Sequence, residues 1–233
     1  MTGSGQTTEV DGIRVPFLEC RMLEGFSKDN DFETNRRAFR SAPGCALRQA
    51  WREQPEMNFT PALVRTGWRE DTLVVWAELM DGDIFTRATE FNQRLWELGD
   101  SFEIFLRPEN QEAYVEFQVA PNGCQLQLRY PHAAALDYAR QSGSIACAVL
   151  SEKQFRATTW VIPERRLWAV CAVIPARAVC DYTSKLVGSR WRFSFSRYDY
   201  TRGEPEPVIS STSPHPAADF HRQQDWGVLE FLP

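Results

Sequence analysis

Between residues 96 and 130 the chain holds three runs in which apolar and polar residues alternate strictly. An alternation of period two is typical of strands with one buried face. Polar turns that contain proline separate the runs, at residues 107–112 and 121–123, and such turns suit hairpins. The pattern therefore predicts an antiparallel meander of three strands. Its buried face would carry the apolar members of each run: Phe102, Ile104, Leu106, Val115, Phe117, Val119, Leu126, Leu128 and Tyr130.

The opposite face of the meander would combine aromatic rings with planar hydrogen-bonding groups. Its members would be Glu103, Phe105, Tyr114, Glu116, Gln118, Gln125, Gln127 and Arg129. Antiparallel sheets commonly leave one face in water, so an ordinary solvated face is one interpretation. A ligand-binding face is the other, because solvent exposure alone does not call for this mixture.

Further strands are predicted at residues 13–23, 47–51, 62–66, 72–80, 145–150, 155–162, 167–174, 191–198 and 226–232. Pro16 lacks a backbone donor and predicts that the first of these is an edge strand. Residues 1–12 are expected to be a flexible N-terminus, residues 131–143 to hold one helical turn, and residues 201–216 to form a long loop. Because no linker interrupts the strands, we expect residues 13–233 to form a single domain. Its predicted fold is all-β: an antiparallel β-sandwich, immunoglobulin-like or jelly-roll-like, with a few short helical turns.

Composition narrows the classes of function. The 26 basic and 31 acidic residues give a net charge of −5, which does not favour binding to nucleic acid or to an anionic membrane. No apolar run is long enough to span a bilayer. An arginine-rich patch at residues 35–40 is expected to be a solvated turn or short helix. The six cysteines form no C-x-x-C pair, so we expect free thiols and a cytoplasmic protein, or a secreted one if a leader has been removed.

Two interpretations assign a function to the polar face. Glu103 and Glu116 would project from adjacent strands, and glycoside hydrolysis requires such a carboxylate pair. Sugar binding instead needs flat rings and planar polar partners. Trp96, Tyr114 and Trp191 are candidate rings, although Trp191 shares its side of the strand with two phenylalanines and is equally expected in the core. No nucleotide-binding loop, metalloprotease motif or nucleophile elbow is present.

Six motifs occur in order from residue 62 onwards. They are ALVRTGW (62–68) with LVVWAE (73–78) and DGDI (81–84), LWE (95–97) with GDSFEIFL (99–106), YVEFQVAPNG (114–123), WAVCAVIP (168–175), WRFSFSR (191–197), and DFH (219–221) with WGVLEF (226–231). This series resembles the family 9 carbohydrate-binding modules and their relatives in the DOMON-like β-sandwich superfamily.

The resemblance implies non-catalytic binding of a mono- or oligosaccharide on a concave sheet face. The ligand-binding residues it implies are Trp96, Glu103, Tyr114, Glu116, Gln118, Trp191 and Arg197, and strand alternation adds Gln127 and Arg129. The sequence departs from the family pattern at Cys171, Ser194 and Leu98-Gly99, where other residues are usual.

No cofactor is expected for this function, although calcium is an ion that such a module could hold. One alternative is a haem-binding domain, which would need an axial ligand such as Met80 or His132. The other is a saccharide-active enzyme that uses Glu103 and Glu116. The resemblance favours the non-catalytic protein over both.

Overall fold

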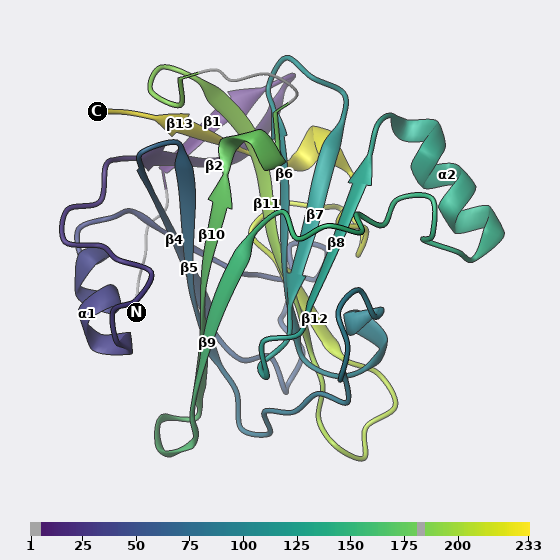
Figure 1. Ribbon diagram of the computed structural model, residues 1–233. Coiled ribbons are helices and arrows are strands. Elements are labelled where there is room, and N and C mark those ends of the chain that lie inside the picture. Colours follow the sequence, from purple (N-terminus) through teal and green to yellow (C-terminus); the bar gives the residue numbers. More distant parts are fainter. Residues whose placement is uncertain (1–5, 181–184) are drawn as a thin grey trace.

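Two β-sheets face each other in the computed structural model, which describes residues 6–180 and 185–233 (Figure 1). The first sheet has eight strands. Seven follow the order β1 (Gln6–Val10), β2 (Ile13–Cys20), β13 (Gly227–Phe231), β11 (Arg190–Asp199), β6 (Ser101–Pro108), β7 (Tyr114–Val119) and β8 (Gln125–Tyr130), and β12 (Val208–Ser211) also pairs with β11. The second sheet has the order β3 (Gly44–Ala46), β4 (Ala62–Arg69), β5 (Thr72–Met80), β10 (Leu167–Pro175) and β9 (Arg156–Ile162). The predicted all-β sandwich is confirmed.

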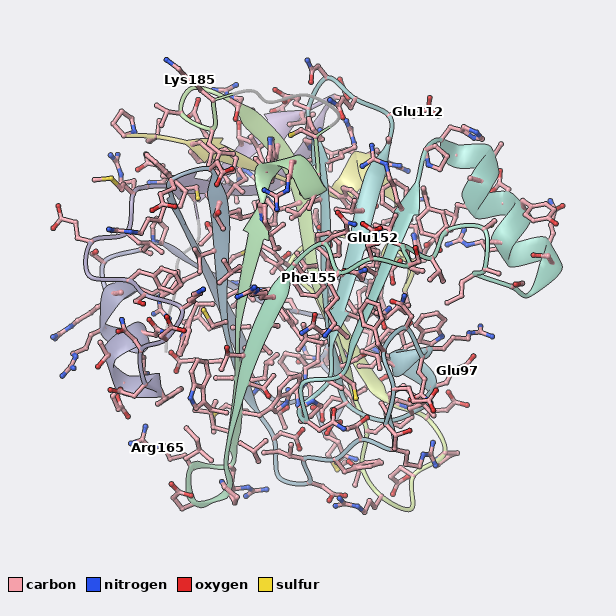
Figure 2. The ribbon with its side chains drawn as sticks, in the orientation of Figure 1. Glu97, Glu112, Glu152, Phe155, Arg165 and Lys185 are labelled. Carbon is pink, nitrogen blue, oxygen red and sulfur yellow. The ribbon has the colours of Figure 1, made fainter. Side chains whose placement is uncertain are left out.

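The three predicted strands of the meander form, as β6, β7 and β8, but β8 presents Leu126, Leu128 and Tyr130 to the face opposite the predicted one. Ile104 pairs with Phe117, and Glu103 pairs with Gln118, so each alternating run keeps one side apolar. The main core lies between the sheets, where the inner side chains of both are almost completely buried. There the ring of Phe155, labelled in Figure 2, stacks on that of Phe117 with centroids 4.5 Å apart.

Several local predictions were wrong at the start of the chain. Residues 6–10, expected to be loose, form β1 and pair with β2, whereas residues 1–5 lie outside the described part. Strand β2 is consequently not an edge strand, because β1 covers one side and β13 the other. Pro16 is tolerated there because the ladder to β13 begins only at Phe17. That ladder is parallel, in a sandwich otherwise built from antiparallel pairs in the described residues.

Four other segments also differ from expectation. The strand predicted at residues 47–51 is replaced by β3 just before it, and the one at 145–150 makes only an isolated bridge between Leu128 and Val149. The expected loop at 201–216 contains β12. The expected single turn after β8 is a longer helix, α2 (Ala133–Ser142), which ends at Gly143 in the left-handed conformation, a typical helix terminus.

Helix α1 (Phe32–Ala38) contains most of the arginine-rich patch and begins at the N-cap Asp31, whose side chain accepts a hydrogen bond from the backbone of Thr34. It lies against the outer face of the second sheet, whereas α2 lies beside β8 (Figure 1). Short 3₁₀ helices occur at Leu95–Glu97 (η1), Pro163–Arg165 (η2), Ala176–Ala178 (η3) and Gln223–Asp225 (η4). No helix in the described ranges is long and apolar enough to cross a bilayer. Cys20, Cys45, Cys124, Cys147 and Cys171 are free, as predicted, and Cys147 is exposed.

Candidate functional site

A cavity of about 290 Å³ lies on the outer face of the first sheet. Strands β6, β7, β8 and β11 form its floor. Helix α2 with residues 143–145 contributes one part of its wall, residues 218–221 another, and residues 94–96 a third. In β6 and β7 the floor is the side that the sequence predicts to be polar, so the cavity is the candidate site.

The centre of the floor is a carboxylate pair held by one amide. Nε2 of Gln118 donates to Oε1 of Glu103 at 2.7 Å and to Oε1 of Glu116 at 2.5 Å. All three side chains are buried. Burial, together with the neighbouring charge of Glu116, raises the pKa of Glu103 well above its ordinary value. Burial also raises the pKa of Glu116 to about 7, against the opposing effect of the Gln118 hydrogen bond.

Two polar atoms of this cluster have no hydrogen-bond partner within the described chain. They are Oε2 of Glu116 and Oε1 of Gln118, and both are buried. An unpaired buried acceptor costs about 1–3 kcal/mol. A hydroxyl-bearing ligand in the cavity could donate to both atoms.

Aromatic groups surround the carboxylates. The rings of Tyr114 and Tyr130 stack with centroids 5.0 Å apart, and the ring of His221 meets both edge-on. The Tyr114 hydroxyl lies 2.7 Å from Nδ1 of His221, whose Nε2 lies 3.7 Å from Oε2 of Glu116. Burial, and next the charge of Arg140, lowers the pKa of His221 to about 4. The imidazole is therefore neutral at pH 7.

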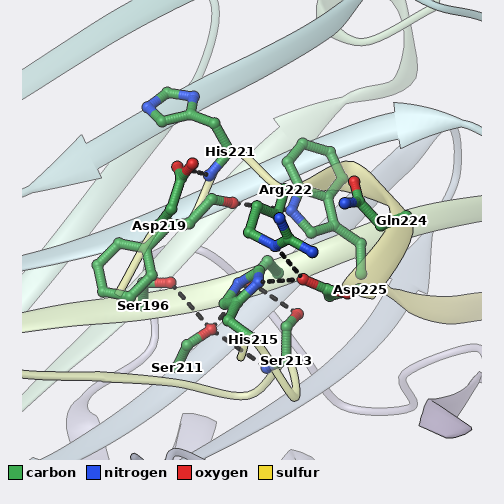
Figure 3. Close-up of polar contacts among 12 residues, drawn as sticks. Ser196, Ser211, Ser213, His215, Asp219, His221, Arg222, Gln224 and Asp225 are labelled. Atoms are coloured by element: carbon green, nitrogen blue, oxygen red, sulfur yellow. Dashed lines mark hydrogen bonds and ion pairs between the residues drawn. The ribbon is translucent and has the colours of Figure 1, made fainter. Parts of the chain in front are cut away.

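The wall at residues 218–221 is fixed from both sides. Asp219 accepts a 2.6 Å hydrogen bond from Arg140, which connects it to α2. On the other side, Asp225 accepts from Arg222 at 2.9 Å and lies 3.1 Å from Nδ1 of His215, in the polar network of Figure 3. This network holds the loop that carries His221.

Four of the predicted site residues line the cavity together: Trp96, Glu103, Glu116 and Gln118. Tyr114 lies directly behind it and holds His221. Trp96 is half-buried, and the guanidinium of Arg94 lies 5.0 Å from the centre of its ring.

Gln127 and Arg129 lie on the opposite face, so their predicted placement was wrong. Glu116 pairs with Leu128, which puts the even-numbered residues of β8 over the cavity. Gln127 instead bonds the backbone of the segment after α2: it donates to the carbonyls of Leu150 and Glu152 and accepts from the amide of Gln154. Its role is to attach that segment to the sheet.

Trp191 and Arg197 also point away from the cavity. Trp191 is buried in the main core, where its ring meets that of Phe231 edge-on. Arg197 faces the same interior and donates to Asp81 at 2.9 Å. Both lie on the side of β11 that faces the interior, and the expectation from Phe193 and Phe195 that Trp191 lies in the core is confirmed.

The carboxylates of Asp81, Asp100 and Asp199 come within 4.8 Å of one another, and they are the one such group found in the described ranges. The guanidinium of Arg197 lies 2.9 Å from Asp81 and 3.0 Å from Asp199, while Asp100 accepts from two backbone amides, those of Phe85 and Tyr200. Calcium needs six to eight oxygen ligands. Since the guanidinium of Arg197 already pairs with two of the three carboxylates, these residues do not fit calcium.

The haem alternative finds no support in the placement of its two candidate ligands. Met80 ends β5 in the second sheet and packs on the outer cluster of that sheet. His132 is exposed at the start of α2, beside the first sheet. They do not share a cavity.

Three of the cavity residues that sequence reasoning missed are informative. His221 and Asp219 stand in the closing DFH motif, which could have suggested them. Tyr130 was assigned to the core from its parity. Of the departures from the family pattern, Ser194 lies on the cavity side of β11, where its hydroxyl is 3.0 Å from that of Ser211.

The fold is similar to that of the family 9 carbohydrate-binding modules. Two solved structures of such a module from Caldicellulosiruptor kristjanssonii, in complex with cellotriose and with glucose, are 15% and 14% identical to this chain. Both superpose with a TM-score of 0.57, and cover 92% of this chain and 93% and 94% of their own. A proposed carbohydrate-binding protein from Bacteroides uniformis is 15% identical, with a TM-score of 0.65 over 91% of this chain and 97% of its own. No family model and no curated protein matches the sequence.

Proposed function

We propose that this protein binds a mono- or oligosaccharide, without catalysis, in the cavity over the first sheet. The observation that carries the proposal is the Glu103–Gln118–Glu116 cluster, which lines the same cavity as Trp96 and contains two oxygens without a hydrogen-bond partner. Sugar hydroxyls donate to carboxylate and amide oxygens, and the C–H face of a pyranose packs on an aromatic ring.

The solved modules with the same fold support this proposal, since they are complexes with cellotriose and glucose. Their descriptions favour neither hydrolysis nor haem binding. The cavity volume of about 290 Å³ is at the lower end of the usual range for small-molecule sites, roughly 300–1,000 Å³. A short saccharide or the end of a longer one fits it better than the side of a polymer.

Isothermal titration against a panel of mono- and oligosaccharides tests the proposal. We expect saturable binding of at least one sugar, which Trp96→Ala and Glu103→Gln abolish without a large loss of melting temperature. Tyr138→Ala is the matched control, because Tyr138 lies on α2 but is 61% exposed and outside the cavity lining. Absence of heat with every sugar at millimolar concentration would reject the proposal.

A further inference from the structure

A second site lies on the other side of the molecule, where two adjoining cavities flank α1. Their volumes are about 400 and 670 Å³, and Glu33, Arg36 and Glu78 line both. We call them together the α1 groove. Nothing in the proposed saccharide site touches it, since that site lies on the outer face of the first sheet.

The larger cavity of the α1 groove exposes an apolar sheet face. Helix α1 covers only part of the second sheet, where Phe32 and Phe39 pack on Trp76 at 5.5 and 5.8 Å. Further along, Leu63, Met80 and Leu167 share the same outer face but line the cavity. The described lining contains no tryptophan or tyrosine, so this surface suits an aliphatic chain better than a sugar ring.

The rim of the groove is basic in a chain whose net charge is −5. The lining of the groove contains two glutamates and six arginines. The arginines are Arg36, Arg37, Arg40, Arg48, Arg65 and Arg165. Each glutamate is already paired. Glu33 accepts a hydrogen bond of 2.6 Å from Arg165, which is labelled in Figure 2. Glu78 accepts one of 3.0 Å from Arg36. The surplus positive charge favours an anionic ligand.

Arg65 connects the basic and apolar parts. Its Nε is buried without a hydrogen-bond partner in the described chain, and its Nη1 lies 3.9 Å from Glu78. Arg65 and Leu63 are two residues apart on β4, and therefore on one face. A head group on Arg65 is thus within reach of a chain that lies on Leu63. The guanidinium fork matches a carboxylate in particular.

We propose that the α1 groove binds a single-chain aliphatic carboxylate. The carboxylate accepts hydrogen bonds from Arg65, and the chain lies across Leu63, Met80 and Leu167. The larger cavity, about 670 Å³, is within the usual range for small-molecule sites. This inference does not depend on the saccharide site.

Titration of the full chain with octanoate, decanoate, decanol and acetate tests the proposal. We expect saturable one-to-one binding of decanoate, on the order of tenfold tighter than octanoate, because two more methylenes are buried. Decanol should bind at least about tenfold more weakly than decanoate, since it lacks the charge that Arg65 recognises. Acetate, which lacks the chain, should not saturate at the same concentrations.

Two variants localise the binding. Arg65→Gln should reduce decanoate affinity to that of decanol, and Leu63→Asn should weaken the dependence on chain length, with thermal melting to confirm that both are folded. Arg190→Gln is the matched control, an exposed arginine on β11 paired with Glu230. Equal affinity for decanol and decanoate, saturation by acetate as tight as by decanoate, or an unchanged affinity in Arg65→Gln would overturn the proposal.

Discussion

The guanidinium of Arg197 lies 2.9 Å from a carboxylate oxygen of Asp81, and the two side chains are only 1% and 3% exposed. This pair joins β11 of the first sheet to the end of β5 in the second. Arg197 also donates to the carbonyl of Met80 at 2.7 Å. Arg197 was expected to bind a ligand, but it instead connects the two sheets.

Removal of one member of this pair should destabilise the fold strongly. We expect Arg197→Gln to lower the free energy of unfolding by about 3–5 kcal/mol, because it leaves buried aspartates without their counter-charge. Denaturation in urea measures the loss. Arg190→Gln, which breaks the exposed pair with Glu230, should cost no more than about 1 kcal/mol. An equal loss in the free energy of unfolding in the two variants would show that Arg197 does not stabilise the contact between the sheets.

Glu116 should make stability depend on pH. Its pKa is raised from the ordinary value of 4.5 to about 7 by burial, so the folded state holds a proton that the unfolded chain releases. The associated stabilisation is complete below about pH 4.5 and is lost as the pH rises through about 7. The loss should be roughly 3 kcal/mol.

Urea denaturation at several pH values, in the wild type and in Glu116→Gln, measures this effect. The variant keeps a neutral side chain at all pH values, so its advantage over the wild type should grow between pH 4.5 and 8. The lowered pKa of His221 acts in the opposite direction, but it is common to both proteins. A constant difference across this range would show that Glu116 does not titrate there.

Gln127→Ala should separate structure from binding. The substitution leaves the carbonyls of Leu150 and Glu152 and the amide of Gln154 without their side-chain partner. We expect a loss of about 2–3 kcal/mol in the free energy of unfolding, while saccharide affinity in the folded protein stays within twofold of wild type. If calorimetry instead showed sugar binding abolished in a fully folded variant, Gln127 would belong to the site.

Tyr114→Phe should weaken saccharide binding only in part. The change removes the hydroxyl 2.7 Å from Nδ1 of His221 but keeps the ring stacked on Tyr130. A lost neutral hydrogen bond costs about 1 kcal/mol, so we expect a roughly fivefold loss of affinity by titration calorimetry. Glu103→Gln, which alters a group that lines the cavity, should have the larger effect.

The sequence by itself determined the sandwich. Alternation placed β6 and β7, and the strands predicted at residues 62–66 and 72–80 are present as the antiparallel pair β4 and β5. It also brought Glu103, Glu116 and Gln118 to one side, because parity within a strand follows directly from the period of two, while Trp96 was named from the family resemblance. These four residues line one cavity.

Only the tertiary structure decided which side of β8 and β11 faces that cavity. In β8 the rule that apolar residues face the core failed because both faces of the strand are covered. Leu126, Leu128 and Tyr130 belong to a second apolar cluster on the outer side, whereas Gln127 faces inward and bonds backbone groups there. In β11 the buried charge of Arg197 is stabilised by Asp199 on the same strand and by Asp81, which the fold brings from a distant part of the sequence. The pattern of apolar residues along one strand indicates which of its side chains are buried. Which part of the chain covers each face is determined by register and by packing between distant segments.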